Sequence, residues 1–257
     1  ARAYGKVAAL ARPAFSALGA VAAQTPGDAR RIAQLGAGNV SVCGNLKFDV
    51  TPAPERIALG KTWRAALGGR PVWLAASTRE GEEALVLEAW RRIAASRALL
   101  VLVPRHPQRF AEVAALLTRL GIDFVRRSDR LPGPETPVWL GDSMGEMAAY
   151  YSLADIAFIG GSLLPLGGQN LIEAAACGCP VVVGPHTFNF QQATADAIAA
   201  GAALRVPDAE ALVGTVCRAL GDASELGKMR AAATGFAASH RGAGARTLAL
   251  IRSAITG

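Results

Sequence analysis

The sequence predicts an α/β fold in which a doubly wound, Rossmann-like parallel sheet is covered by helices on both faces. Short apolar runs alternate with helical stretches along most of the chain, beginning with residues 72–76 and 99–103. Hydrophobic residues make up 51% of the chain and charged residues 18%, which supplies a large core and argues against disorder. Further strands are expected at residues 124–127, 138–140, 156–159, 181–183 and 203–206, with helices between them and from Asp208 onward.

The first fifty residues are expected to belong to a different domain. They read as helix (3–18), strand (20–24), helix and strand (40–43), with Thr25 capping the second helix and Gly36 ending it. The proline-rich connector Val-Thr-Pro-Ala-Pro follows. We therefore predict the tail of a truncated α/β domain in residues 1–50 and a donor-binding domain with C-terminal helices in residues 51–257. The chain begins without a Met inside an expected helix, so the sequence is expected to be a fragment.

Composition narrows the classes of partner. The net charge of +7 suits nucleic acid, an anionic membrane surface or a strongly anionic small substrate. Nucleic acid is the least favoured, because the basic residues form no single tract and are not interleaved with aromatic ones. The four cysteines lack zinc spacing and read as reduced thiols. No stretch reads as a signal peptide or a membrane span.

The residues directly after each strand are candidate site residues, because open parallel sheets bind ligands beyond the carboxyl ends of their strands. After the strand at 72–76, Ser77 and Glu80 have the spacing of a helix capping box, whose amides can also face an anion. After the next strand, the guanidinium of Arg105 can grip a phosphate or a carboxylate through two hydrogen bonds. The neighbouring His106 either faces the ligand or bonds a nearby loop.

The junction at residues 141–146, Gly-Asp-Ser-Met-Gly-Glu, has two interpretations. Ser143 and Glu146 have capping-box spacing, which by itself explains the carboxylate. A divalent metal held by Asp142 and Glu146 is less favoured, because magnesium needs more oxygen ligands than this loop offers.

The loop at residues 160–173 predicts a phosphate site. Gly167 and Gly168 let the backbone approach a ligand closely, and a helix starting near Asn170 would direct its positive end at a phosphate. Glu173 would share one face of the first helical turn with Asn170. There its carboxylate either accepts hydrogen bonds from two ribose hydroxyls or bonds back to the Asn170 amide. Four such junctions in one sheet predict the donor-binding part of a nucleotide-sugar enzyme.

Together these residues resemble the C-terminal half of the Kdo transferases, which add 3-deoxy-D-manno-octulosonic acid (Kdo) to the lipid A precursor. The matching stretches are Gly44-Asn-Leu-Lys-Phe-Asp49, Ala75-Ala-Ser-Thr78, Val103-Pro-Arg-His-Pro107, Leu140-Gly-Asp-Ser-Met-Gly-Glu146, Gly160-Gly-Ser162 and Gly184-Pro-His-Thr-Phe-Asn-Phe190. The resemblance implies a two-domain GT-B glycosyltransferase that binds CMP-Kdo in its C-terminal domain and the lipid in its N-terminal one. It also implies inverting transfer, without metal or cofactor, at the cytoplasmic face of the bacterial inner membrane in lipopolysaccharide biosynthesis.

The resemblance also implies residue roles. Lys47 is expected to stabilise transition-state charge, although a solvated loop lysine is an alternative. The residues expected to bind CMP-Kdo are Pro104, Arg105, Met144, Gly145, Glu146, Asn170, Leu171, Ile172 and Glu173, with Ser77, His106, Gly168 and Gln169 as further candidates. Family members are expected to read Gly-Gly-His-Asn-Pro where this chain has Gln169 and Leu171. Gln169 keeps hydrogen-bonding capacity but carries no proton near neutral pH.

Two features of the family have no counterpart in this sequence: the glutamate that serves as catalytic base and the segment that associates with an anionic membrane, both in the N-terminal domain. The chain alone is therefore expected to be soluble, to bind CMP or CMP-Kdo and to transfer nothing. Alternative interpretations are another GT-B enzyme, such as a UDP-sugar transferase or epimerase, and a non-catalytic nucleotide-binding module.

Overall fold

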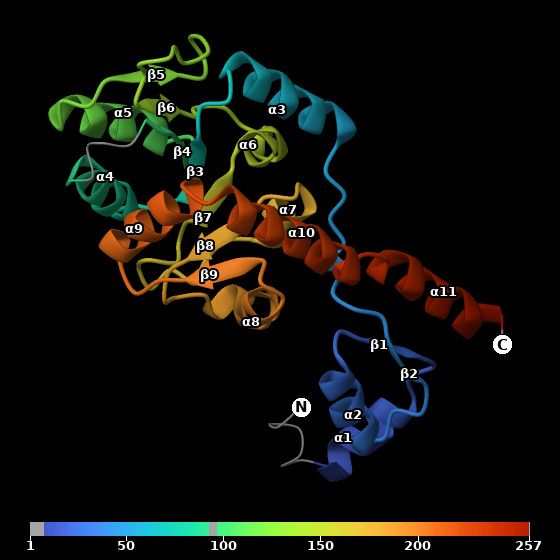
Figure 1. Ribbon diagram of the computed structural model, residues 1–257. Coiled ribbons are helices and arrows are strands. Elements are labelled where there is room, and N and C mark those ends of the chain that lie inside the picture. The colour runs from blue at the N-terminus through green and yellow to red at the C-terminus, as the bar shows by residue number, and fades with distance from the viewer. Residues whose placement is uncertain (1–7, 93–96, 257) are drawn as a thin grey trace. The chain divides into compact units, whose positions relative to one another are not determined.

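The computed structural model describes residues 8–92 and 97–256 (Figure 1). Residues 3–7 of the first expected helix, and residues 93–96 of the helix expected between the strands at 72–76 and 99–103, lie outside the described residues. The chain divides into two compact units, one combining the residues up to Val50 with those from Ala238 onward, the other being Thr51–Ala237. The C-terminal helix thus groups with the N-terminal residues, a grouping that the sequence analysis did not make. The assignment of an acceptor and a donor domain stays a prediction.

The second unit is built on a seven-stranded sheet in which every neighbouring pair of strands is parallel. The strand order is β5-β6-β4-β3-β7-β8-β9. The strands are β3 (Val72–Thr78), β4 (Leu99–Pro104), β5 (Phe124–Arg126), β6 (Val138–Leu140), β7 (Ile156–Ile159), β8 (Val181–Val183) and β9 (Ala203–Arg205). The predicted parallel α/β sheet is confirmed, and its central strands are continuous apolar runs because both of their faces are buried.

Helices cover both faces of this sheet (Figure 1). One face carries α4 (Glu82–Arg92), α5 (Arg109–Arg119) and α9 (Ala209–Leu220), and the other carries α3 (Pro54–Ala66), α6 (Met147–Leu153) and α7 (Ile172–Ala176). The helices α8 (Gln191–Ala199) and α10 (Ala223–His240) complete the set. Trp73, Leu100 and Phe158 are fully buried in the core beneath α4, α5 and α9.

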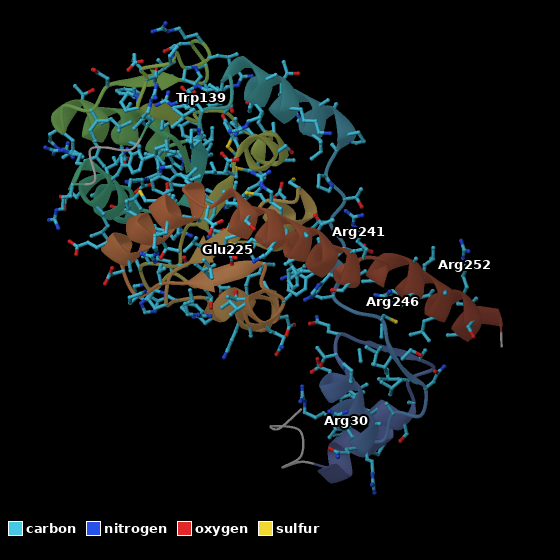
Figure 2. The ribbon with its side chains drawn as sticks, viewed as in Figure 1. Arg30, Trp139, Glu225, Arg241, Arg246 and Arg252 are labelled. Atoms are coloured by element: carbon cyan, nitrogen blue, oxygen red, sulfur yellow. The ribbon has the colours of Figure 1, made fainter. Side chains whose placement is uncertain are left out.

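An aromatic cluster joins α3 and α6 to the sheet. Trp63 lies edge-on to Trp139, with ring centroids 5.1 Å apart, and its ring centroid is 5.2 Å from that of Tyr150. The guanidinium of Arg127 lies 4.9 Å from the centre of the Trp63 ring, a cation–π distance. Trp139, on β6, is fully buried where it contacts Trp63 of α3 and Tyr150 of α6 (Figure 2). This packing fixes the end of β6, where one of the candidate junctions begins.

The first unit holds a two-stranded parallel sheet. Its elements are α1 (Ala8–Ser16), β1 (Val21–Ala23), α2 (Pro26–Gln34), β2 (Val40–Val42), the 3-10 turn η2 (Leu46–Phe48) and α11 (Ala243–Thr256). The predicted start of α2 is confirmed, because the Thr25 hydroxyl accepts the Asp28 amide at 3.0 Å and Pro26 is the first helical residue. Gly36 follows the helix with φ +107°, which confirms the predicted end.

Helix α11 is attached to the N-terminal residues by two side chains. The carboxylate of Asp49 accepts the main-chain amides of Gly242 and Gly244 at 2.9 and 2.8 Å. Arg246, which lies along α11 in Figure 2, donates from Nε to the Cys43 carbonyl at 3.0 Å. These contacts explain why the last residues group with the first unit.

Candidate nucleotide site at the sheet edge

The sheet order places the four predicted junctions side by side. Strands β6, β4, β3 and β7 are consecutive neighbours, so their carboxyl ends lie along one edge. The chain order reverses at β3, which has β4 on one side and β7 on the other. Such a reversal is the point at which open α/β sheets bind ligands.

Arg105 and Glu173 are brought together at this edge. Arg105 follows β4 directly, and its amide donates to the Thr78 carbonyl at 2.9 Å, which ties the loop to the end of β3. Burial raises the pKa of Glu173, and the positive charge of Arg105 opposes that rise, so the two side chains interact electrostatically. The side chains of Arg105 and His106 are exposed, and Pro104 is buried as the last residue of β4. A cation and a carboxylate therefore lie at the same edge of the sheet.

The loop between β7 and α7 closes on itself. The Gly168 amide donates to the Gly161 carbonyl at 2.7 Å, and the Gly167 carbonyl accepts the Asn189 amide at 3.0 Å. Gly167 and Gly168 have φ values of +91° and +75°, which only glycine adopts easily. A Cβ on Gly160 would lie 2.4 Å from the Ser77 carbonyl oxygen, so this residue lets β7 and β3 meet.

The helix after this loop begins close to the predicted residue, Asn170, and is short. Helix α7 begins at Ile172, two residues after Asn170, and its capping residue is Leu171, which makes no side-chain bond to the helix. The Asn170 side chain accepts the Ile172 amide at 3.0 Å. With five residues, α7 has few aligned peptide dipoles, so its attraction for a phosphate is weaker than expected. Leu171 and Ile172 are each 1% exposed, so these two predicted binding residues are buried, and the Ile172 amide already has a partner in Asn170.

The turn after β6 contains one buried carboxylate. Glu146 is 8% exposed and accepts hydrogen bonds from Ser143 Oγ and, at 3.1 Å, from Arg127 Nη2. It caps α6 without a side-chain bond to the helix, so the predicted Ser143–Glu146 capping box is wrong. The Ser143 hydroxyl bonds the carboxylate in place of a helix amide. Met144 is 58% exposed and Gly145 has φ +73°, which leaves this turn open at the sheet edge.

The predicted Ser77–Glu80 capping box is also wrong. Strand β3 runs on through Thr78, and Ser77 has φ +54° at an irregularity in the strand pairing. Helix α4 begins later, at Glu82, whose carboxylate accepts the Arg79 amide at 2.9 Å. The Ser77 carbonyl is therefore packed against Gly160, and the helix start is set by Glu82.

Two residues at this edge were missed by the sequence analysis. A Cβ on Gly161 would lie 3.6 Å from Arg79 Cγ and 3.3 Å from Gln169 Nε2, so a second guanidinium side chain borders the glycine loop. Glu82 is fully buried and accepts the amides of Gly161 and Leu163. The signal for Arg79 was its place directly after a strand, and the signal for Glu82 was an acidic pair at a helix start.

Lys47 lies in the first unit. It is the middle residue of η2, its side chain is exposed, and its amide donates to the Asn45 side chain at 3.0 Å. Its catalytic role stays a prediction.

Possible metal ligands and thiols are the remaining side chains of chemical interest. Among residues 8–92 and 97–256, no three His, Cys, Asp or Glu side chains are grouped closely enough to hold a metal ion. The four cysteines are free thiols. Burial raises the pKa of Cys177 to about 12, which keeps this thiol protonated at neutral pH. A hollow of about 850 Å³ lies at the opposite edge, before β3 and β6, and no candidate site residue lines it.

The fold is that of GT-B glycosyltransferases. The structure of Anabaena Alr3699/HepE in complex with UDP and glucose matches this chain with a TM-score of 0.54. The match covers 96% of this chain and 66% of the HepE chain. At 15% identity this likeness shows the fold alone.

Sequence similarity is more specific. Residues 1–50 match the family model of 3-deoxy-D-manno-octulosonic-acid transferase (kdotransferase). The 3-deoxy-D-manno-octulosonic acid transferases of Bordetella pertussis and Haemophilus influenzae are 49% and 41% identical over 92% and 74% of this chain. The C-terminal CMP-Kdo binding domain of WaaA from Acinetobacter baumannii is 34% identical with a TM-score of 0.65, over 98% of that domain and 75% of this chain. The chain belongs to the Kdo transferase family.

The chain spans 57% of the length of the Bordetella relative and 46% of the Haemophilus one. In the part of the chain that the structure describes, every helix is too short or too polar to cross a bilayer.

Proposed function

We propose that this chain is the donor-binding part of a Kdo transferase and that it binds CMP-Kdo at the edge formed by β6, β4, β3 and β7. The observation that carries the proposal is that Arg105 directly follows β4 and Glu173 follows the loop after β7, so that both lie at the carboxyl edge on either side of β3. The likeness to the CMP-Kdo binding domain of WaaA supports the choice of donor.

Arg105 and Glu173 suit the two ends of a nucleotide. The exposed guanidinium of Arg105 binds the CMP phosphate, and the carboxylate of Glu173 accepts hydrogen bonds from ribose hydroxyls. The open turn at Met144, Gly145 and Glu146 lies farther along the same edge and offers main-chain groups to the base. The remaining predicted donor-binding residues are Pro104, Asn170, Leu171 and Ile172, and further candidates are Ser77, His106, Gly168 and Gln169.

The whole protein transfers Kdo to the lipid A precursor in lipopolysaccharide biosynthesis. The acceptor hydroxyl oxygen bonds to the anomeric carbon on the face opposite to CMP while the bond to the CMP phosphate breaks, and a base takes the hydroxyl proton. Lys47 stabilises the charge that develops on the departing phosphate. No metal or cofactor takes part. The reaction takes place at the cytoplasmic face of the bacterial inner membrane, where the acceptor domain binds the lipid and the anionic surface, and nucleic acid is no partner.

Calorimetric titration with CMP tests the site. We expect Arg105→Ala and Glu173→Ala each to weaken CMP binding about tenfold or more, which corresponds to about 1.4 kcal/mol. Arg119→Ala, which removes an exposed arginine from the last turn of α5, is the control for lost positive charge and should bind CMP like the wild type. Unchanged affinity in both site variants contradicts the site assignment.

The HepE likeness raises one alternative, a UDP-sugar enzyme on the same fold. Competition between CMP and UDP for the wild-type chain separates the two, and we expect CMP to displace UDP. A non-catalytic nucleotide-binding module would also bind CMP. Kdo transfer to a lipid acceptor by the complete protein, and its loss in Lys47→Ala, distinguishes the enzyme from such a module.

A further inference from the structure

Glu82 is a buried carboxylate whose partners are main-chain amides. Its Oε2 accepts the Arg79 amide at 2.9 Å and the Gly161 amide at 2.6 Å, and its Oε1 accepts the Leu163 amide at 3.0 Å. Arg79 follows β3, whereas Gly161 and Leu163 follow β7. One side chain at the start of α4 therefore connects the ends of the two strands that meet at the chain reversal.

The adjacent Glu83 is equally buried but is held differently. Its Oε1 accepts the Thr78 hydroxyl at 3.0 Å, and its Oε2 pairs with Arg109 Nη2 at 3.2 Å. Glu83 is thus neutralised by a side-chain cation on α5. Glu82 instead receives three amide dipoles, and removal of its carboxylate leaves buried N–H groups without partners.

The contacts of Glu82 continue into the candidate site. Glu82 holds Gly161, whose carbonyl accepts the Gly168 amide at 2.7 Å and so fixes the end of the loop. Gln169 comes next in the chain, and Glu173 follows in the first turn of α7. The position of the carboxylate of Glu173 therefore depends on a loop whose first residues are bonded to Glu82.

We propose that Glu82 is a positioning residue for the donor nucleotide. Its carboxylate fixes the main chain at Gly161 and Leu163, and this fixes the loop that carries Gln169 and Glu173 to the nucleotide. The inference rests on the proposed function only in its choice of ligand. Glu82 itself touches no nucleotide.

Substitution of adjacent carboxylates tests this role. In the 257-residue chain, Glu82→Gln leaves one acceptor oxygen and places an NH₂ group against the amides, so we expect CMP binding to weaken roughly tenfold in calorimetry. The NMR amide resonances of Gly161 and Leu163 should shift, because a hydrogen bond to a carboxylate is replaced. The control Glu83→Gln removes an equally buried carboxylate that bonds Thr78 and Arg109 instead of these amides, and it should leave CMP affinity and these resonances near wild-type values.

Each outcome decides a separate point. Wild-type CMP affinity in Glu82→Gln, or unmoved Gly161 and Leu163 resonances, overturns the positioning role. If the wild-type chain binds no CMP, the proposed function fails, and the resonances still show whether Glu82 fixes the loop.

If Glu82→Gln does not fold, Glu82→Asp replaces it. The shorter carboxylate of aspartate keeps the charge but reaches fewer amides, so we expect shifted resonances and a smaller loss of CMP affinity. Wild-type affinity and resonances in Glu82→Asp then overturn the role.

Discussion

At the scale of single residues, Glu173 has conflicting requirements for stability and for binding. Burial raises its pKa and therefore disfavours the charged carboxylate, whereas Arg105 favours it. A charged carboxylate is what ribose hydroxyls need as an acceptor. In the proposed site, Glu173 therefore combines a binding role that needs the charge with a burial that disfavours it, a combination that is common at functional sites.

This conflict predicts a pH-dependent stability difference between the wild type and Glu173→Gln. A carboxyl group whose folded pKa is raised adds stability below its ordinary value of 4.5 and loses it as the pH rises through the folded pKa. Glutamine does not titrate, so the midpoint of thermal unfolding of the variant should rise relative to the wild type between pH 4 and pH 8. Scanning calorimetry across that range measures this difference.

Glu88→Gln is the matched control, because it removes an exposed carboxylate from α4. A Glu173→Gln midpoint that falls relative to the wild type as the pH rises would show that the carboxylate stabilises the fold when charged. Glu173→Gln should also bind CMP more weakly than the wild type, so its stability and its CMP affinity are expected to change in opposite directions at pH 8.

At the scale of secondary-structure elements, the sequence predicted strands better than helix starts. Buried strands such as β4 are apolar runs that any tertiary context preserves. The start of α4 involves a long-range contact, because the carboxylate of Glu82, its first residue, accepts the amide of Gly161 in the loop after β7. Local spacing at Ser77 carries no information about such contacts.

The candidate site shows the same division. The sequence could predict that Arg105 and the loop at 160–173 follow strands, and hence that they lie at the carboxyl edge. It could not predict that β6, β4, β3 and β7 are consecutive, because the order of strands is a property of the folded sheet. Arg79 was passed over because local spacing did not distinguish it.

The contact between α3 and α6 carries a prediction about stability. A Cβ on Gly60 would lie 2.3 Å from the Ala149 carbonyl oxygen and 2.8 Å from Ser152 Cβ, so Gly60→Ala must push the two helices apart. Overpacking costs about 1–3 kcal/mol, and the better helix propensity of alanine returns about 1 kcal/mol of it. We expect a net loss of up to about 2 kcal/mol in the free energy of unfolding, measured by urea titration.

Gly227→Ala in α10 serves as the control, because a Cβ there would contact nothing within 4 Å. Helix propensity alone should make this variant more stable by about 0.5–1 kcal/mol. Equal effects in the two variants would mean that the close approach at Gly60 does not limit the packing of α3 on α6.

At the scale of the whole molecule, the two compact units divide the predicted roles between them. The candidate nucleotide residues lie within Thr51–Ala237, whereas Lys47 lies in the unit that holds β1, β2 and α11. The residues that match the kdotransferase family model, 1–50, also belong to that unit. Binding of CMP and catalysis of transfer are therefore expected to respond to changes in different parts of the chain.

This division predicts which part of the chain CMP protects. A ligand that binds only the folded state at 100 times its dissociation constant stabilises that state by about 2.7 kcal/mol. Amide hydrogen exchange should slow in the loop at 160–173 and around Arg105, and it should be unchanged in β1 and β2, because the candidate ligand contacts lie in Thr51–Ala237. Arg105→Ala at the same CMP concentration should lose most of this protection. Protection confined to β1 and β2 would place the nucleotide in the first unit and so contradict the sheet-edge site.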